Sequence, residues 1–201
     1  MRTYLVNTAA TTYPVTLAET KLHLKVDVNT DDNLISSLIV AATQISEEYT
    51  NRFFINTELT MTCTDWSDLS SLLKSNVVFD YQTNTIKYYA PNDSNNLTTL
   101  SNSTYNVLSE YEPAQVEIRE NFSYPDIQKR NDAINITYTA GYGTAANVPN
   151  AIKQSILLTI GNWYSNRSSV VIGRIATELP QSAKWLLDTY KVQVLRWYLV
   201  N

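Results

Sequence analysis

The feature that most constrains the fold of this chain is a change in the spacing of its apolar residues, which occurs twice. Up to residue 53, and again from about residue 144, apolar residues recur every three or four positions, as in amphipathic helices. Between residues 54 and 143 they alternate with polar residues, which is typical of strands with one buried face. The sequence therefore predicts an α+β fold with a β segment inserted between two helical parts.

Two helices are predicted before the β segment. The first begins at Thr16, which forms a capping box with Glu19, and covers residues 16–27. The second covers residues 30–52 and opens with two aspartates, whose negative charge suits the positive end of the helix dipole. Its apolar residues recur at spacings of three and four, so we expect a long amphipathic helix here.

Two more helices are predicted after the β segment. One begins at Pro149 and ends near Arg167, and the other begins near Pro180. Proline is favoured at a helix start because its missing N–H has no partner there. The stretch between these helices, residues 168–177, fits neither period. The tail from Val192 could continue the last helix or form a strand.

The middle of the chain predicts several short strands separated by turns rich in Asn, Asp, Ser and Pro. The alternating stretches are Leu59–Cys63, Val77–Phe79, Ile86–Tyr88, Tyr105–Val107, Val116–Ile118 and Ile134–Tyr138. Short strands at regular spacing indicate a small antiparallel β sandwich or barrel. The predicted parts are a helical part (1–53), a β insertion (54–143), a second helical part (144–191) and a tail (192–201). The two helical parts can form one four-helix core, because an insertion leaves and re-enters at neighbouring points.

Composition excludes several classes of protein. The net charge is −4, so the chain lacks the basic character that strong, phosphate-driven binding of nucleic acid needs. A single cysteine, Cys63, cannot form an internal disulfide or a Cys-rich zinc site, and its alternating neighbours predict that it is buried and inert. No apolar run approaches the roughly 20 residues of a membrane span, so no membrane contact is expected.

Residues with catalytic potential are few and poorly grouped. His23 is the only histidine, and its place in an amphipathic helix favours a structural or surface role. Paired carboxylates, which could act as acid and base on a sugar, occur at Asp31/Asp32, Glu47/Glu48 and Asp65/Asp68. Helix dipoles and a solvated helix face explain the first two pairs better than catalysis does.

Trp66 lies between the third pair of acids, and two interpretations of it remain open. It could be a platform for a sugar ring, which would make the β segment a carbohydrate-binding or hydrolytic module. An exposed aromatic in a turn is the simpler interpretation. No glycine-rich phosphate loop and no nucleophile motif is present in the sequence. We therefore expect no enzyme activity, no cofactor and no catalytic or metal-binding residues.

The aromatic residues of the C-terminal part are more informative. Trp163, Tyr164 and Trp185 are expected in the helical core. Trp197 and Tyr198 lie in an apolar C-terminus, although chain ends are usually polar and frayed. Trp, Tyr and Arg dominate the energetics of protein interfaces, so the tail is expected to bind a partner. The alternative is that it packs on its own domain.

Both ends of the chain resemble phage head–tail connector proteins. At the N-terminal end the resemblance lies in Val15–Asp27 (VTLAETKLHLKVD), Asp31–Ile35 (DDNLI) and Glu47–Arg52 (EEYTNR). At the C-terminal end it lies in Tyr138–Tyr142 (YTAGY), Val148-Pro149, Ile152–Gln154 (IKQ), Trp163–Arg167 (WYSNR) and Glu178–Pro180 (ELP). Lys25 stands where the family usually has Arg, and Asn51 where it usually has Gly. The β segment matches the family only in position and pattern.

The resemblance implies a structural virion protein that forms a ring, usually of twelve copies, under the portal. Such a ring joins head to tail in the virion neck and extends the channel through which genomic DNA passes without specific binding. The implied partners are further copies of the chain, the portal protein and the next neck or tail ring protein, with assembly in the cytoplasm of the bacterial host. The alternative within this class is another neck or tail-completion ring protein.

Two segments are expected to make the contacts of such a ring. Portal docking is assigned by hypothesis to the tail residues Val192, Val194, Leu195, Arg196, Trp197, Tyr198 and Leu199. Contacts with a neighbouring subunit or ring are assigned to the loop residues Ser168, Val170, Val171, Ile172, Arg174 and Ile175.

Overall fold

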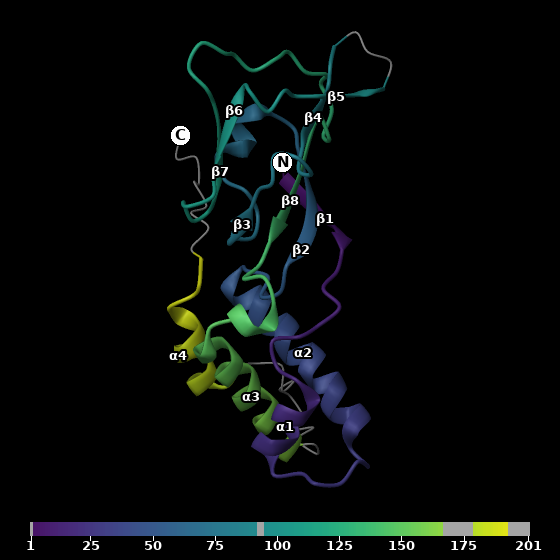
Figure 1. Cartoon of the computed structure of the whole chain (residues 1–201), viewed down its shortest axis with the longest axis vertical. Coiled ribbons are helices and arrows are strands. Elements are labelled where there is room, and N and C mark those ends of the chain that lie inside the picture. The colour runs from purple at the N-terminus through teal and green to yellow at the C-terminus, as the bar shows by residue number, and fades with distance from the viewer. Residues whose placement is uncertain (1, 92–94, 167–178, 193–201) are drawn as a thin grey trace, which may run out of the picture. The chain divides into compact units, whose positions relative to one another are not determined.

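The computed structural model describes residues 2–91, 95–166 and 179–192 (Figure 1). These residues contain four α-helices and eight strands, which confirms the α+β class. The chain divides into two compact units. The helical unit consists of Thr11–Ile55 and Tyr142–Lys191, and the β unit consists of Met1–Ala10, Asn56–Gly141 and, from the C-terminal segment, Val192.

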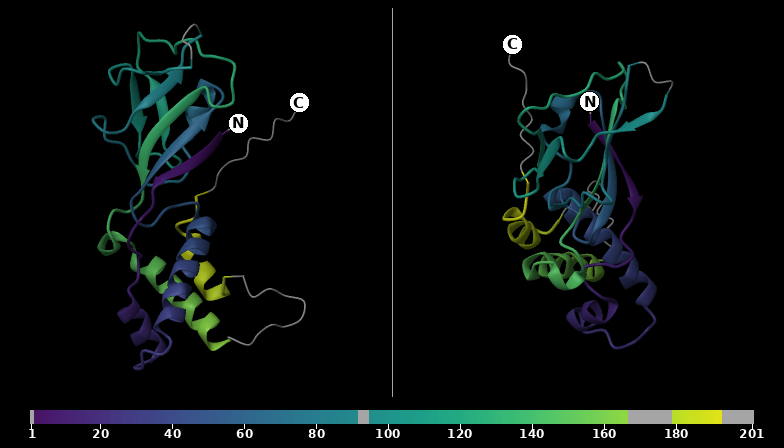
Figure 2. Two further views of the ribbon diagram at one scale, coloured as in Figure 1. Left: turned by 90° about the vertical axis from the view of Figure 1, so that its right-hand side faces the viewer. Right: turned by 45° about the horizontal axis from the view of Figure 1, so that its top comes forward.

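The helical unit is assembled from both ends of the chain. Its helices are α1 (Leu17–Leu24), α2 (Asp32–Thr50), α3 (Asn150–Ser165) and α4 (Gln181–Asp188), so each of the four predicted helices is present. Helix α2 packs against α3, and both α1 and α4 pack against this pair (Figure 2). Helices more than a hundred residues apart in sequence therefore share one core.

The apolar faces of α2 and α3 form the centre of that core. Ile35, Ile39 and Ala42 of α2 are at most 4% exposed, and so are Ile152, Ile156 and Ile160 of α3. Their spacing of three and four residues places each set on one side of its helix. Each fully buried aliphatic side chain of this kind contributes about 1.5–3 kcal/mol to the free energy of folding.

The predicted capping box of α1 is confirmed. The Thr16 hydroxyl accepts a hydrogen bond from the Glu19 backbone N–H at 3.1 Å, and the Glu19 carboxylate accepts one from the Thr16 N–H at 2.7 Å. Both α1 and α2 end at a residue in the left-handed conformation, Lys25 and Asn51, each with φ of 56°. Asparagine adopts this conformation readily, as glycine does at many helix ends.

Hydrogen bonds also join the N-terminal helices to the C-terminal ones. They run from Tyr164 Oη to Asp31 Oδ2 (2.6 Å), from Tyr49 Oη to Asp188 Oδ1 (2.5 Å) and from Arg52 Nε to the Tyr190 carbonyl oxygen (2.6 Å). The Arg52 side chain is buried, and bonds to a charged donor are stronger than neutral ones. These contacts fix the position of α2 against the C-terminal helices of the same unit.

The β unit contains one antiparallel sheet of six strands and a separate two-stranded hairpin. The sheet has the order β1-β2-β8-β4-β5, with β3 paired to β8, and β6 and β7 form the hairpin. The bounds are β1 (Arg2–Thr8), β2 (Thr57–Cys63), β3 (Val77–Val78), β4 (Ile86–Tyr89), β5 (Leu97–Thr99), β6 (Tyr105–Leu108), β7 (Gln115–Ile118) and β8 (Ile134–Ala140). The expectation of short antiparallel strands in the middle of the chain is confirmed.

Strands β2 and β8 carry the core of the sheet. Every second residue of each is buried, from Thr57 to Cys63 and from Ile134 to Ala140, so one face of the sheet is dry. Tyr138 in β8 is fully buried, and its hydroxyl donates a hydrogen bond to the Leu73 carbonyl oxygen. A buried hydroxyl needs such a partner, because an unpaired one would weaken the fold.

Strand β1 was not predicted. It pairs with β2 from Arg2↔Cys63 to Thr8↔Glu58, with an irregularity near its end. Most of its residues are exposed, so the sequence Arg2–Thr8 lacks the apolar alternation that marks a half-buried strand. The first residues of the chain thus complete the sheet, although they precede the helices.

Candidate functional site

The residues with catalytic potential do not gather into a site. His23 is exposed on α1 and lies beside α3, where its Nε2 is 3.5 Å from the place that a Cβ at position 161 would occupy. Within the described ranges, no group of three or more His, Cys, Asp or Glu side chains could hold a metal ion. Cys63 is fully buried, and burial raises the pKa of its thiol to about 12. It is therefore inert as predicted, since the thiolate is the reactive form.

Trp66 does not offer an open platform for a sugar. It begins a short 3-10 helix (Trp66–Ser70) and is only 8% exposed, so the expectation of an exposed turn residue is wrong. Tyr124 stacks on its indole ring with centroids 4.9 Å apart, and the indole N–H donates to the Pro125 carbonyl oxygen at 2.8 Å. Both contacts come from the long loop before β8. No local pattern in the sequence indicates that this loop packs on Trp66.

The acids beside Trp66 support the local backbone. Asp65 is the N-cap of the 3-10 helix, and its carboxylate accepts a hydrogen bond from the Ser67 N–H at 3.0 Å. This bond holds the pKa of Asp65 below its usual value. Asp68 accepts from the Thr64 N–H at 3.3 Å. Both carboxylates thus face the chain's own backbone.

The two carboxylate pairs of the helical unit also have structural partners. Asp31 accepts the Tyr164 hydroxyl, and Asp32 forms an ion pair with Lys21 at 2.7 Å. In the second pair, Glu47 accepts a hydrogen bond from the Phe54 N–H at 2.8 Å and so anchors the turn after α2. Glu48 lies on the exposed face of the helix, as expected.

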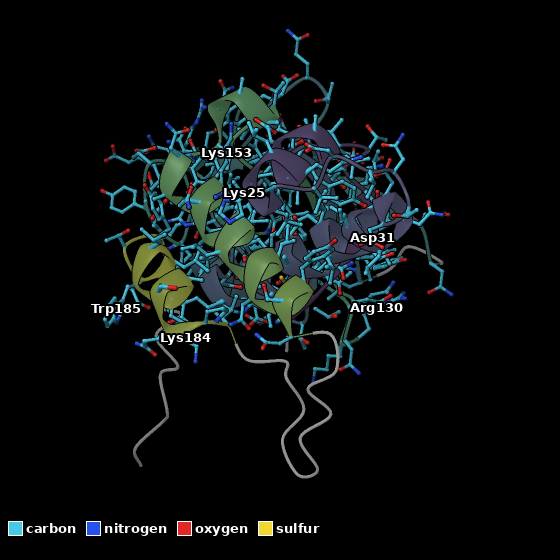
Figure 3. All side chains as sticks on the ribbon, turned by 90° about the horizontal axis from the view of Figure 1, so that it is seen from below. Lys25, Asp31, Arg130, Lys153, Lys184 and Trp185 are labelled. Carbon is cyan, nitrogen blue, oxygen red and sulfur yellow. The ribbon has the colours of Figure 1, made fainter. Side chains whose placement is uncertain are left out.

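Helix α4 exposes a tryptophan on the helical unit. Ala183 and Leu187 are buried, whereas Trp185 between them is 68% exposed, so the expectation that it is a core residue is wrong. A residue two positions from each of two buried neighbours points about 160° away from them, because successive residues turn by about 100°. Figure 3 shows Trp185 at the edge of α4, projecting from the unit. The helical period by itself predicts this exposed position.

A second unusual feature of the helical unit is a hollow with mostly apolar walls. We call it the apolar groove; it has a volume of about 680 Å³ and runs between the segment before α1, the middle of α2 and the 3-10 helix Ala145–Asn147. Its apolar lining residues are Tyr13, Val15, Leu17, Ile39, Val40, Ala145 and Ala146. A more polar hollow of about 560 Å³ lies between α1, α3 and the start of α4, beside His23 and Pro180.

The β unit has an open sheet edge. Strand β1 ends the order of the six-stranded sheet, and among the residues that the structure describes only β2 pairs with it. Leu5 is 69% exposed on this strand and Val6 is 37% exposed. An edge strand with exposed apolar side chains is a template for pairing with another chain unless something covers it.

Other exposed aromatic residues of the β unit are Tyr81 before β4, Tyr111 near the β6–β7 turn, and Phe122 and Tyr124 in the loop before β8. In the same unit the Arg130 guanidinium lies over the Tyr89 ring at 3.6 Å and donates hydrogen bonds to Asp132. None of the helices that the structure describes is long and apolar enough to span a membrane.

The segments predicted to make assembly contacts lie almost wholly outside the described residues. This holds for the loop from Ser168 to Ile175 and for the tail from Val194 to Leu199. Val192 is described; it is 7% exposed and belongs to the β unit. The assignment of these segments to portal and subunit contacts stays a prediction.

Comparisons with known proteins identify structures that share the fold of this chain. A search of curated proteins found none that matches this chain. Several solved structures are similar in fold, including the following three. The first is described as the neck of an empty GTA particle computed with C6 symmetry (18% identity, 96% of this chain and 98% of that chain, TM-score 0.75). The second is the virion of a native gene transfer agent (GTA) particle (19%, 96% and 97%, TM-score 0.74). The third is the neck of a native GTA particle computed with C12 symmetry (18%, 96% and 98%, TM-score 0.69).

The family of the chain follows from a match that covers both helical parts and the β insertion. A family model described as head completion protein matches residues 15–192, and the chain therefore belongs to the head completion protein family.

Proposed function

We propose that this protein forms a closed ring in the virion neck, beneath the portal, that joins head to tail and extends the DNA channel. The expected number of copies is twelve. Membership of the head completion protein family confirms the resemblance to connector proteins, and it makes the chain a structural virion protein rather than an enzyme. The position in the neck, the ring and the partners are the parts that we propose.

The observation that carries the proposal is the family match over residues 15–192 together with a shared fold over 96% of the chain. The similar chains come from structures described as particle necks, and one neck was computed with twelvefold symmetry. Twelve copies around an axis need a heterologous interface, in which one face of a subunit fits a different face of its neighbour. Exposed apolar features on both units, such as the β1 edge and Trp185, suit such contacts.

The tail supplies the proposed contact with the portal. Val192 is buried in the β unit, so the chain beyond it starts from a fixed point. The sequence that follows, Gln193–Asn201, carries Trp197 and Tyr198 among aliphatic residues. An apolar peptide of this kind can bind a groove or add a strand to a sheet edge of the portal.

The test is a truncation that ends the chain at Val192, the last residue that the structure describes, which is buried. We expect the truncated protein to keep its circular dichroism spectrum and thermal stability, and to lose co-sedimentation with purified portal rings of the same phage. The double variant Trp197→Ala/Tyr198→Ala should weaken binding in the same direction. Normal docking of the truncated protein on the portal would contradict the role of the tail.

The charge of the chain suits a conduit for DNA. A net charge of −4 leaves little attraction for phosphates, so DNA would pass the ring without being held. We expect the assembled ring to show no measurable retention of double-stranded DNA in a filter-binding assay at 150 mM salt. Tight binding under those conditions, or a belt of Lys and Arg along the bore, would contradict this part.

A second candidate is a different neck or tail-completion ring, which would share the fold and dock elsewhere. It predicts binding to a tail ring protein and none to the portal, so the same co-sedimentation assay separates the two. A carbohydrate-binding β module has less support, because Tyr124 already stacks on Trp66 and the neighbouring acids bond their own backbone.

A further inference from the structure

We propose that Trp185 of one subunit inserts into the apolar groove of a second copy, and that this contact is the heterologous interface that closes the ring. The inference rests on the proposed function, because it names the contact that a ring of this chain would use. It follows from three features of the helical unit: an exposed tryptophan, an open apolar groove, and the absence of α4 residues from the described lining of that groove.

Trp185 has the properties of an interface anchor. It is 68% exposed on α4, while Ala183 and Leu187 fix the opposite face of that helix in the core. Tryptophan is the residue type most enriched at binding hot spots, where it buries about 150–250 Å² of surface at a low entropy cost. On a rigid helix its orientation is already set, so binding would lose little additional freedom.

The apolar groove has the size and chemistry to accept an indole ring. Its volume of about 680 Å³ lies within the roughly 300–1,000 Å³ of pockets that hold ligands larger than an indole. Val15 and Ile39 are buried and form apolar walls, while Tyr13 is 40% exposed and can stack on an entering ring. None of the described residues that line the groove is charged.

Charges beside the two features are complementary. Lys184 precedes Trp185, and it forms no ion pair within ranges 2–91, 95–166 and 179–192. Glu19 lies beside the groove, since its carboxylate accepts the hydroxyl of the groove residue Thr16 at 2.7 Å. Hydrogen bonds from the Thr16 backbone and side chain, together with the nearby charge of Lys153, hold the pKa of Glu19 below its usual value, so the carboxylate is ionised at neutral pH. A docked Trp185 would bring Lys184 towards this carboxylate and favour one register.

Trp185 lies away from the groove of its own subunit, which no described α4 residue lines. The groove contacts α2 at Ser36, Ile39 and Val40, whereas α4 is bonded to α2 at Tyr49. At 1.5 Å per residue, nine residues along a helix correspond to about 14 Å. Figure 3 shows α4 with Trp185 on one side of α3, and α1 and the start of α2 on the other side. An occupant from α4 must therefore come from another copy, and two different faces then meet, which generates a ring when the rotation closes.

The experiment compares four full-length proteins: the wild type, Trp185→Ala, Ala146→Arg and the control Tyr111→Ala. Ala146 is exposed at the groove, so an arginine there fills the groove without entering the core. Tyr111 is a similarly exposed aromatic, 54% exposed, in the β unit. Assembly is followed by mass photometry over a concentration series, with and without portal rings, after circular dichroism has confirmed the fold of each protein.

We expect Trp185→Ala and Ala146→Arg each to raise the concentration needed for assembly by about tenfold or more, as loss of a hot spot does. Tyr111→Ala should assemble as the wild type does. A double variant, Trp185→Cys with Val40→Cys, should give a ladder of disulfide-linked dimers, trimers and larger species, since the buried Cys63 does not compete.

Two failures can be told apart. If the wild type forms no ring with or without the portal, the proposed function fails. If the wild type forms rings and both Trp185→Ala and Ala146→Arg form them equally well, this inference alone is overturned. It is also overturned if Tyr111→Ala loses assembly to the same extent, or if the double-cysteine variant stays monomeric while the rings form.

Discussion

Replacing Thr16 by alanine removes half of the capping box of α1. The hydroxyl of Thr16 accepts the Glu19 N–H at 3.1 Å and donates to the Glu19 carboxylate at 2.7 Å, and both bonds are lost in the variant. The third bond, from the Thr16 backbone N–H to the same carboxylate at 2.7 Å, can persist. The groups are exposed, so water replaces part of the loss. We therefore expect the free energy of unfolding to fall by about 1 kcal/mol, within the roughly 0.5–2 kcal/mol range of N-cap replacements.

The stability that the Glu19 carboxylate contributes should decrease as the pH falls. The Thr16 backbone N–H, and after it the hydroxyl, lower the pKa of Glu19 from its ordinary value of 4.5. A carboxyl with a lowered folded-state pKa contributes stability above its unfolded pKa, and this is lost as the pH falls through the folded value. The difference in free energy of unfolding between the wild type and Glu19→Gln should reach its maximum by pH 7. It should become smaller as the pH falls below about 4.5.

Hydrogen exchange of the α1 amides measures the loss of the Thr16 cap locally. Urea unfolding followed by circular dichroism measures the change in free energy of unfolding for the whole chain. Thr16→Ser keeps the hydroxyl and should behave like the wild type. Thr11→Ala changes an exposed threonine outside the helix and should be neutral within about 0.5 kcal/mol. Equal exchange rates in the wild type and Thr16→Ala would refute the assigned cap.

Three further variants or measurements test the two cores. Ile156→Ala, in the fully buried face of α3, should lower the free energy of unfolding in urea by about 2–5 kcal/mol, whereas Leu22→Ala, 81% exposed, should change it by less than about 0.5 kcal/mol. Tyr138→Phe leaves the Leu73 carbonyl oxygen without its donor and should cost about 1–3 kcal/mol by the same measurement; an unchanged midpoint would contradict the bond. Cys63 should resist a thiol reagent at pH 8 in the folded protein and react once urea unfolds it, because burial raises its pKa to about 12; rapid labelling of the native protein would contradict that burial.

The parts of the fold that follow a local rule could be predicted from the sequence. The capping box at Thr16 and the apolar period of Asp32–Thr50 located α1 and α2, because both signals lie within the element that they specify. The alternation in Thr57–Cys63 and Ile134–Ala140 located the two central strands in the same way.

The parts that depend on distant partners could not be predicted. Strand β1 has little apolar alternation because most of its residues stay exposed, and only its pairing with β2 makes it a strand. Trp66 is buried by Tyr124, which follows it by more than fifty residues. The apolar groove combines three segments, from around Tyr13, α2 and Ala145, and none of them carries a binding motif of its own.

Trp185 shows a different reason for a wrong prediction. The period of α4 places it opposite Ala183 and Leu187, so its exposure was implied by the sequence. Residue type suggested the core, and residue type is a weaker guide than position on a helix of known period. The candidate interface could thus have been found in part from the sequence, whereas the groove that it fits could not.

Electron cryo-microscopy of the intact virion neck tests the central claim most directly. The account predicts a closed ring of chains with this α+β fold directly beneath the portal, with twelve copies and with the helical unit of each subunit in contact with its neighbour. Finding this fold at another position in the particle, or as isolated copies without a closed ring, would contradict it.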